Sequence, residues 1–164
     1  MKLWLASTAG ALLGLGPAAA LAQASPPNSG LEVDTDAATK ACVPPAQAQQ
    51  SPSSLTQAER QRFVACIDAV AARQLNAQLP RQIDDVTRLD RITTDGPVLT
   101  YHYTVLRRVA DLPPNVIPAI EQSTRTHVCA QANMVSTMAM GGSYGYRWVD
   151  PDGREIHRIT ISSC

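Results

Sequence analysis

An uncharged run at the N-terminus constrains this chain more than any other feature, because it decides which residues take part in folding. The run spans residues 3–22 after the positive charge of Lys2, and Ala22-Gln23-Ala24 ends it with the small-x-small pattern of a cleavage site. This pattern predicts a secretory signal peptide over residues 1–24 and a mature chain that begins at Ser25. A membrane anchor is the alternative, but the run is rich in Ala and Gly and is less apolar than a span of roughly 20 residues requires.

Four cysteines, Cys42, Cys66, Cys129 and Cys164, follow the predicted cleavage site. An even number of cysteines in an exported chain predicts disulfides, and the sequence permits three pairings. We favour Cys42–Cys66 with Cys129–Cys164, because the second bond would tie the last residue to the body of the fold. No spacing between them gives C-x-x-C, and the three histidines are not spaced like zinc ligands. We therefore expect no metal site and no cofactor.

The charge balance argues against a nucleic-acid partner. The chain has 14 basic and 14 acidic side chains, and loss of Lys2 with the signal peptide leaves a formal charge of 13 − 14 = −1. A nucleic-acid-binding surface would show a basic excess. The processed length suits about one domain, and we expect no membrane span after processing.

Residues 25–54 are rich in Pro, Gln and Ser and contain no aromatic residue. A segment of this composition buries too little apolar area to offset the entropy lost on ordering. We therefore predict a flexible leader over residues 25–54, with Cys42 as the residue that pins it, and a single folded domain over residues 55–164.

The first half of that domain carries signals for a helix and a hairpin. Thr56-Gln57-Ala58-Glu59 is a capping box, and apolar residues at helical spacing behind it predict a helix over residues 57–78. Residues 86–94 and 98–106 have the character of strands on either side of the turn Asp95-Gly96-Pro97.

The second half repeats the scheme. A second helix is expected to open near Asp111, and residues 133–140 to form a short helix that Gly141-Gly142 caps. Residues 143–149 and 156–163 then predict a second hairpin around an Asp-Pro-Asp-Gly turn. The expected order is leader, α, β, β, α, short α, β, β. This order predicts an α+β domain whose antiparallel sheet of two hairpins is covered by helices on one face.

Five aromatic residues lie in rows on two of the predicted strands: Tyr101, Tyr103, Tyr144, Tyr146 and Trp148. They can fill the core beneath the helices, or they can form an exposed binding surface for a protein, glycan or small ligand. Alternation with small and polar residues favours the core, and the binding surface stays open as the alternative.

No established catalytic motif occurs in the sequence. His102 lies on the polar side of its strand and would act as a general base only beside a fixed acid or nucleophile. Asp150 and Asp152 are explained by turn chemistry, and Asp84-Asp85 precedes a strand. We identify no catalytic residue, and we favour a binding function over an enzymatic one.

Several short stretches resemble a loose group of small exported α+β proteins of Gram-negative bacteria that have no assigned activity. The resemblance covers residues 76–164 and implies a secreted α+β fold with a late disulfide, and it carries over no functional residue. The stretches that carry it are Leu79-Pro80, Asp84, Thr87, Leu89, Leu99-Thr100-Tyr101-His102-Tyr103, Cys129, Gly142, Tyr144, Tyr146 and Asp152-Gly153.

These observations predict a periplasmic or secreted domain that works by binding an envelope or secreted protein. An accessory, inhibitor or immunity type of function fits a small, near-neutral chain without a catalytic motif. Two alternatives remain: a small hydrolase with a site near His102, and a carrier with a ligand cavity beneath the sheet. A concave pocket with convergent polar groups would favour the enzyme, and a closed apolar cavity would favour the carrier.

Processing provides the first test. N-terminal sequencing of the protein recovered from the periplasm should start at Ser25, and the protein should be in the soluble fraction, because the uncharged run is removed on export. A sequence that starts at Met1, or recovery in the membrane fraction alone, would show that the run is an anchor.

Overall fold

A computed structural model describes residues 31–43 and 54–164 of the chain. The predicted signal peptide and its cleavage site lie outside the described residues, as do residues 44–53. The elements follow one another in the order α1 (Thr35–Cys42), α2 (Gln57–Asn76), β1 (Arg81–Asp84), β2 (Thr87–Asp95), β3 (Val98–Val105), a short 3-10 helix (Val109–Asp111), α3 (Val116–Ala130), α4 (Ala132–Ala139), β4 (Ser143–Val149) and β5 (Glu155–Ile161).

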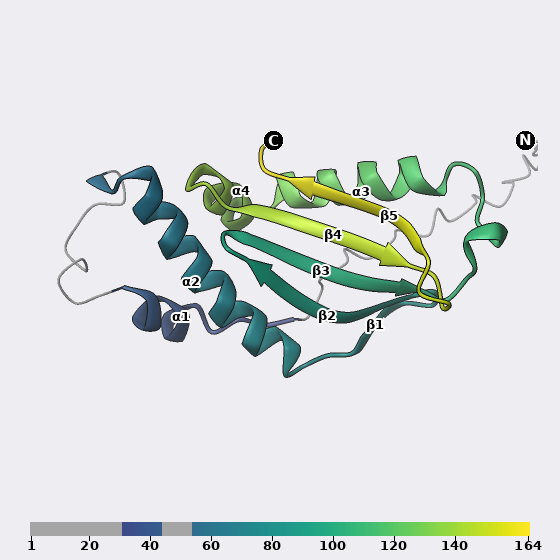
Figure 1. Cartoon of the computed structure of the whole chain (residues 1–164), viewed down its shortest axis with the longest axis horizontal. Helices are drawn as coiled ribbons and strands as arrows, with labels where there is room; N and C mark the ends of the chain where they lie inside the picture. The colour runs from purple at the N-terminus through teal and green to yellow at the C-terminus, as the bar shows by residue number, and fades with distance from the viewer. Residues whose placement is uncertain (1–30, 44–53) are drawn as a thin grey trace, which may run out of the picture.

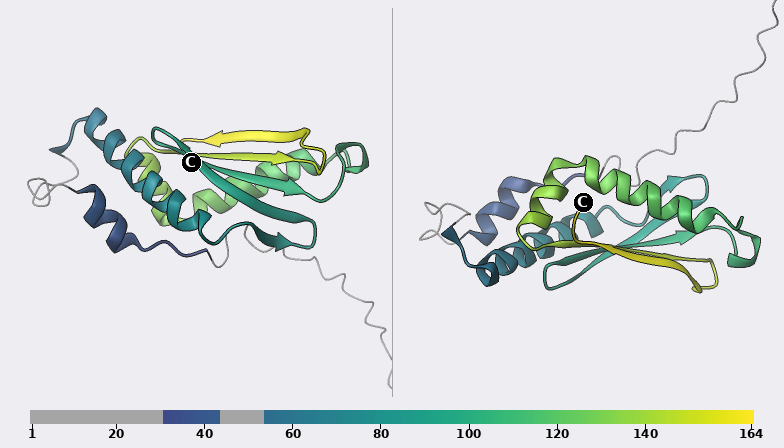
Figure 2. Two further views of the ribbon diagram at one scale, coloured as in Figure 1. Left: turned by 60° about the horizontal axis from the view of Figure 1, so that its bottom comes forward. Right: turned by 90° about the horizontal axis from the view of Figure 1, so that it is seen from above.

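The strands form one five-stranded sheet in the order β1-β2-β3-β4-β5 (Figure 1). All neighbours are antiparallel except β3 and β4, which are parallel. The helices lie together on one face of the sheet, and the other face is uncovered (Figure 2). The α+β class and the one-sided helical layer are therefore as predicted from the sequence.

Local signals placed most elements correctly. The capping box at α2 is formed, because the Glu59 carboxylate accepts from the Thr56 amide at 2.8 Å and the Thr56 hydroxyl accepts from the Glu59 amide at 3.3 Å. After α4, Gly141 has a φ of +92°, and the Gly142 amide donates to the Thr137 carbonyl at 3.0 Å. This is the Schellman ending that the glycine pair predicts.

The two predicted hairpins, β2–β3 and β4–β5, are both formed, but the sheet that they build is not wholly antiparallel. Its central pair is parallel because residues 106–142, which include α3 and α4, cross from the end of β3 back to its start. A parallel pair requires such a long connection, whereas an antiparallel pair can be closed by a short turn. The edge strand β1 was also not expected from the sequence.

The prediction of a leader without regular structure is wrong for residues 31–43. Asp34 caps α1 by accepting a hydrogen bond from the Ala37 amide at 2.8 Å, and Ala38 is buried against the rest of the domain. The composition argument failed because it counted apolar area over the whole segment. A cap, one small buried side chain and a covalent bond are enough to hold a short helix.

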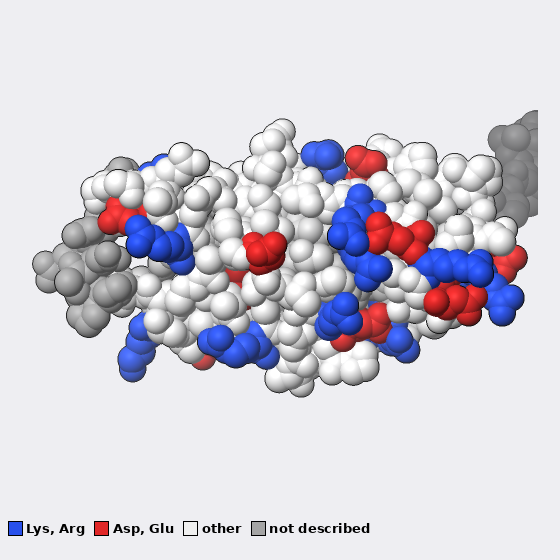
Figure 3. Space-filling view, viewed as in Figure 1, with Lys and Arg blue, Asp and Glu red and all other residues white. Residues whose placement is uncertain are grey.

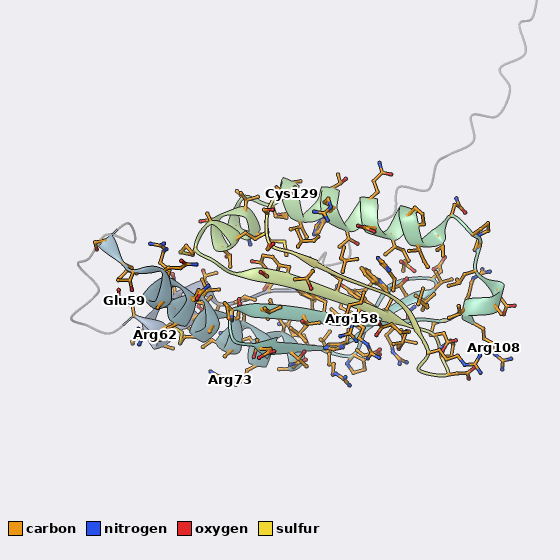
Figure 4. The ribbon with its side chains drawn as sticks, turned by 45° about the horizontal axis from the view of Figure 1, so that its top comes forward. Glu59, Arg62, Arg73, Arg108, Cys129 and Arg158 are labelled. Atoms are coloured by element: carbon orange, nitrogen blue, oxygen red, sulfur yellow. A yellow bond between two sulfur atoms is a disulfide. The ribbon has the colours of Figure 1, made fainter. Side chains whose placement is uncertain are left out.

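Both disulfides join the cysteines that we favoured from the sequence. Cys42, at the end of α1, is bonded to Cys66 of α2, and Cys129 of α3 is bonded to the C-terminal Cys164. Figure 4 shows Cys129 at the end of α3 that lies next to the C-terminal tail. One bond therefore fastens α1 to the body of the domain, and the other fastens the tail that follows β5.

The aromatic rows form the core and not an exposed binding surface. The rows come together because β3 and β4 are paired, with Tyr101 opposite Tyr146 and Tyr103 opposite Trp148. Each of the five side chains, Tyr101, Tyr103, Tyr144, Tyr146 and Trp148, is at most 6% exposed beneath the helices. The alternative of an exposed aromatic binding surface is therefore wrong. The residues that alternate with the five aromatic side chains face the uncovered side of the sheet.

No helix among residues 31–43 and 54–164 combines the length and the apolar character needed to cross a bilayer.

The two disulfides should contribute unequally to stability. The loops they close are of similar length, 24 and 35 residues, so loop entropy alone predicts about 3–4 kcal/mol for each. Cys129–Cys164 fixes the end of the sheet, whereas Cys42–Cys66 fixes a peripheral helix. Cys164→Ser should therefore lower the melting temperature more than Cys42→Ser does, as measured by calorimetry.

Non-reducing peptide mapping of the wild-type protein is the control for that comparison. Equal losses in the two variants would mean that α1 supports the core as strongly as the final strand does.

Candidate functional site

A cleft lies on the helical face of the sheet, at the end where the α1–α2 pair faces the α3–α4 pair. Residues 31–35 and α2 form one wall, and α4 with the end of α3 forms the other. Figure 2 shows these two groups of helices over the same face of the sheet. The cleft has a volume of about 510 Å³ and is lined by Leu31, Val33, Thr35, Ile67, Asp68, Ala71, Leu75, Leu99, Tyr101, His127, Gln131, Asn133, Met134, Thr137 and Tyr144.

Apolar side chains make up the floor and the walls. Leu99, Tyr101 and Tyr144 rise from β3 and β4, so the ends of the two aromatic rows form the floor. Met134 of α4 and Leu75 of α2 face each other across it, and both belong to the buried core. The candidate binding residues Tyr101 and Tyr144 therefore line a cleft after all, as buried floor residues, whereas Tyr103, Tyr146 and Trp148 do not line it.

One carboxyl group, that of Asp68 on α2, interrupts this apolar lining. Asp68 is 4% exposed, and its Oδ2 atom has no hydrogen-bond partner among the described residues. Burial disfavours the charged form and raises the pKa of Asp68 to about 6. A carboxyl group with a raised pKa in a cleft is a candidate for ligand binding, because it can offer a donor or an acceptor near neutral pH.

The rim of the cleft is polar. His127, Gln131, Asn133 and Thr137 border it from the α3–α4 side, and Asn133 is exposed. Burial lowers the pKa of His127, so its imidazole is held neutral at neutral pH. An apolar floor with amide, hydroxyl and imidazole groups at its edge is the usual composition of a binding cleft.

Gln74 of α2 and Gln78, which lies two residues beyond the end of that helix, hold the segment that forms the other wall. The side-chain Oε1 atom of Gln74 accepts from the backbone amide of Asp34 at 2.7 Å, and the side-chain Nε2 atom of Gln78 donates to the backbone carbonyl of Glu32 at 2.9 Å. Weaker reciprocal bonds, at 3.5 Å for Gln74 and 3.4 Å for Gln78, complete each pair. Residues 31–34 thus lie extended along α2, fixed by side-chain amides.

The sequence analysis missed Asp68, Gln74 and Gln78. Asp68 falls between Val64 and Ala72 on the buried side of α2, and an acidic residue in an apolar stripe was a signal that could have been noted. Gln74 and Gln78 are four residues apart in the sequence, but nothing in their spacing indicates that they bind backbone groups.

His102 lies on the opposite, uncovered face of the sheet. Its Nε2 atom is 2.8 Å from the Thr93 hydroxyl, while its Nδ1 atom has no hydrogen-bond partner among the described residues. Burial, followed by the nearby Arg91, Arg147 and Arg158, lowers the pKa of His102. Among the described residues no acidic side chain is hydrogen-bonded to the imidazole to orient it, so this geometry does not favour the hydrolase alternative.

Several other charged groups of that face are paired with one another. Arg147 and Arg158 both donate to the Glu155 carboxylate, at 2.8 and 2.7 Å, and hold the pKa of Glu155 at about 2. Asp90 accepts from Arg88 and from the Thr104 hydroxyl. Figure 3 shows this face, where arginines and acidic residues are interspersed. No group of three or more His, Cys, Asp or Glu residues suited to a metal occurs in the described part of the chain.

The buried Asp68 carboxyl group should make stability depend on pH. Because the folded-state pKa is about 6 and the reference value is 3.8, the folded state binds this proton more tightly than the unfolded state does. The free energy of unfolding should therefore fall as pH rises from about 4 to above 6. Between pH 5 and 8 the Asp68 contribution should be roughly 1–2 kcal/mol, and Asp68→Asn should abolish it.

Urea unfolding of both proteins at pH 5 and pH 8 measures that difference, and the exposed Asp85→Asn is the matched control. A wild-type protein that loses no more stability than Asp68→Asn over this range would show that the carboxyl group is solvated.

No protein-family model matches this chain, and no curated protein sequence matches it. Solved structures do share its fold. EpsS, a pilotin of the type 2 secretion system of Vibrio vulnificus, aligns with a TM-score of 0.56 at 16% identity over 63% of this chain and 92% of that chain.

Two further structures give the same result. AspS, a type II secretion system pilotin of Vibrio cholerae, aligns with a TM-score of 0.52 at 20% identity over 63% of this chain and 93% of its own. A protein of Pseudomonas aeruginosa inferred to be secreted aligns with a TM-score of 0.55 at 15% identity, over 62% and 91%. At these identities the likeness establishes a common fold.

Proposed function

We propose that this protein is an exported accessory protein of the Gram-negative cell envelope, and that it binds a segment of a partner protein in the cleft between α2 and the α3–α4 pair. The observation that carries the proposal is the cleft itself. Its floor of Leu99, Tyr101 and Tyr144 is apolar, and its rim supplies hydrogen-bonding groups. This is the composition that buries apolar side chains of a partner while satisfying the partner's polar groups.

The structural neighbours support a role for this protein in an envelope assembly. Two of the structural neighbours are pilotins from secretion systems, which favours an accessory of an envelope assembly over an inhibitor or immunity protein. Neither the balanced charge of the chain nor the paired arginines of the uncovered face suit a nucleic acid.

Export is supported by two independent features. The predicted signal peptide directs the chain out of the cytoplasm, and both bonds Cys42–Cys66 and Cys129–Cys164 are of a kind that persists in oxidising compartments. We accordingly place the protein in the periplasm or outside the cell.

The cleft geometry also separates this proposal from a carrier function. A carrier encloses its ligand, whereas this cleft opens at exposed rim residues such as Thr35 and Asn133. An open apolar cleft suits a segment that remains attached to a larger partner.

Site-specific photocrosslinking in the natural host tests the proposal. A photoreactive phenylalanine analogue at Asn133 on the cleft rim should give a crosslinked adduct with one defined envelope protein, identified by mass spectrometry. The same analogue at Thr160, which is exposed on β5 and pairs with Gly145 on the uncovered face, is the matched control and should give none.

A cleft-blocking variant makes the test specific. Ala71 is 8% exposed and lines the cleft, so Ala71→Phe should fill it and abolish the Asn133 adduct in a protein that still folds by circular dichroism. An adduct that persists in Ala71→Phe, or one that forms equally from Thr160, would place the partner elsewhere.

A further inference from the structure

Residues 31–34, which we call the strap, are bound to α2 in the manner of a peptide ligand. The backbone groups of Glu32 pair with the Gln78 amide, and those of Asp34 pair with the Gln74 amide, each as donor and as acceptor. These contacts involve main-chain atoms of the strap only. Such contacts hold an extended chain without reading its sequence, as main-chain bonds do when a peptide joins a sheet edge.

The spacing of the two glutamines matches an extended chain. Gln74 belongs to α2, and Gln78 lies in the turn just after it, where the Gln78 backbone amide donates to the Leu75 carbonyl at 2.9 Å. A helical or 3-10 rise of about 1.5–2 Å per residue separates the two glutamines by about 6–8 Å along the axis. Two residues of an extended chain span about 6.6 Å, which is the separation of Glu32 and Asp34. The strap runs antiparallel to α2, because Glu32 meets Gln78 and Asp34 meets Gln74.

The side chains of the strap alternate as those of a strand do. Leu31 and Val33 point into the cleft and pack on the core, whereas Glu32 and Asp34 are exposed. Both apolar side chains are only partly buried, so the strap covers one side of the cleft without filling it. Cleft volume of about 510 Å³ remains beside it.

We propose that Gln74 of α2 and Gln78, just beyond its end, form a binding site for extended peptides, and that the strap occupies this site as an internal ligand. The partner is then an extended segment with apolar side chains at positions i and i+2, and it competes with the strap. This inference rests on the proposed function and specifies both the conformation of the partner segment and its regulation. Binding of the partner would then require release of residues 31–34 from α2.

An extended partner fits this site better than a helical one. A helix uses its own backbone groups internally, so it offers no carbonyl or amide to Gln74 and Gln78. Gln74, which is only partly exposed, would lose the backbone partners that it has in this structure, and the exposed Gln78 would bond water in place of the partner.

A peptide-binding experiment on the full chain tests the inference. The probe is an acetylated, fluorescently labelled peptide that copies residues 31–36, Leu-Glu-Val-Asp-Thr-Asp, and the readout is fluorescence anisotropy. In the variant Leu31→Ser with Val33→Ser the internal ligand loses its two apolar contacts. The apparent Kd of the probe should fall by at least about tenfold relative to the wild-type protein, because the competing strap holds the site closed in the latter.

A second variant guards against loss of folding in the first. Glu32 is exposed, and its amide donates to Gln78; Glu32→Pro removes that donor without touching the core. We expect a smaller gain in probe affinity of at least about twofold. We call these two proteins, Leu31→Ser with Val33→Ser and Glu32→Pro, the release variants. Equal probe affinity in the wild-type protein and in a folded release variant would show that the strap does not compete with the probe.

Two controls test the mode of binding. A peptide in which the first Leu and Glu are exchanged has the same composition but breaks the i, i+2 alternation, and it should bind at least about tenfold more weakly to the release variant. Adding Gln78→Glu to that variant removes the amide donor to the backbone and should weaken the original probe. Equal binding of the two peptides, or no effect of Gln78→Glu, would overturn the reading of an extended backbone.

The outcome is separable from the proposed function. Absence of probe binding to every release variant, together with a crosslink from Asn133 that Ala71→Phe abolishes, would leave the cleft as a docking site and exclude the extended mode, as would a helical segment in the crosslinked partner. Probe binding to the release variants without any crosslink would show a peptide site whose partner does not reach the α4 rim.

Discussion

Stacking of aromatic side chains across the parallel β3–β4 pair is the interaction on which the rest of the domain depends. The ring centroids of Tyr101 and Tyr146 are 5.2 Å apart, those of Tyr103 and Trp148 are 5.7 Å apart, and the planes of each pair differ by 14°. Tyr146 and Trp148 also lie 5.8 Å from each other along β4. Each aromatic pair contributes roughly 0.5–1.5 kcal/mol beyond its buried area. The rows therefore fix the register of the only parallel pair in the described sheet, which no short turn can set.

On the other face Gly145 lies opposite Thr100, where a Cβ atom at position 145 would come within 2.5 Å of the Thr100 hydroxyl. The same register thus needs aromatic residues on one face and a glycine on the other.

The candidate site follows from where these rows end. Toward Trp148 the row is closed by His157, whose ring stacks on Trp148 at 6.2 Å and whose Nε2 atom is 3.6 Å from the Glu121 carboxylate of α3. Toward Tyr144 the helical layer divides, because on this one face α2 packs over β2 and β3 whereas α3 packs over β5. The floor left between them is apolar because it is made of core residues. Residues 31–35 border this gap, and they are held by Gln74 and Gln78 more than by their own burial.

Local signals in the sequence were sufficient for most of the fold but not for the site. Alternation over Leu99, Tyr101 and Tyr103, the capping box at Thr56 and the glycine pair after α4 each indicate structure within a few residues, and all were interpreted correctly. The parallel pairing of β3 with β4 depends on how a long connection crosses the sheet, which no local pattern encodes. The helix α1 was missed because a short helix with little apolar area has a weak signal of its own. Asp68, Gln74 and the strap acquire their roles only from the tertiary contacts that surround them.

The buried Asp68 carboxyl group and the strap have a common physical meaning. This carboxyl group is 4% exposed, and its Oδ2 atom has no hydrogen-bond partner among residues 31–43 and 54–164, so it costs stability when it ionises. An asparagine or an apolar residue would be the better choice for folding alone. The strap likewise leaves Leu31 and Val33 only partly buried, although the cleft has room for larger side chains. Both features line the same cleft. Asp68 lacks a hydrogen bond there, and Leu31 and Val33 are less fully packed than the aromatic side chains of the core. Sites that bind partners are commonly less stable than the scaffold that supports them. The rigid aromatic rows supply that scaffold here, so the cost of an incompletely packed cleft falls on the wall formed by α2 and the strap and not on the sheet.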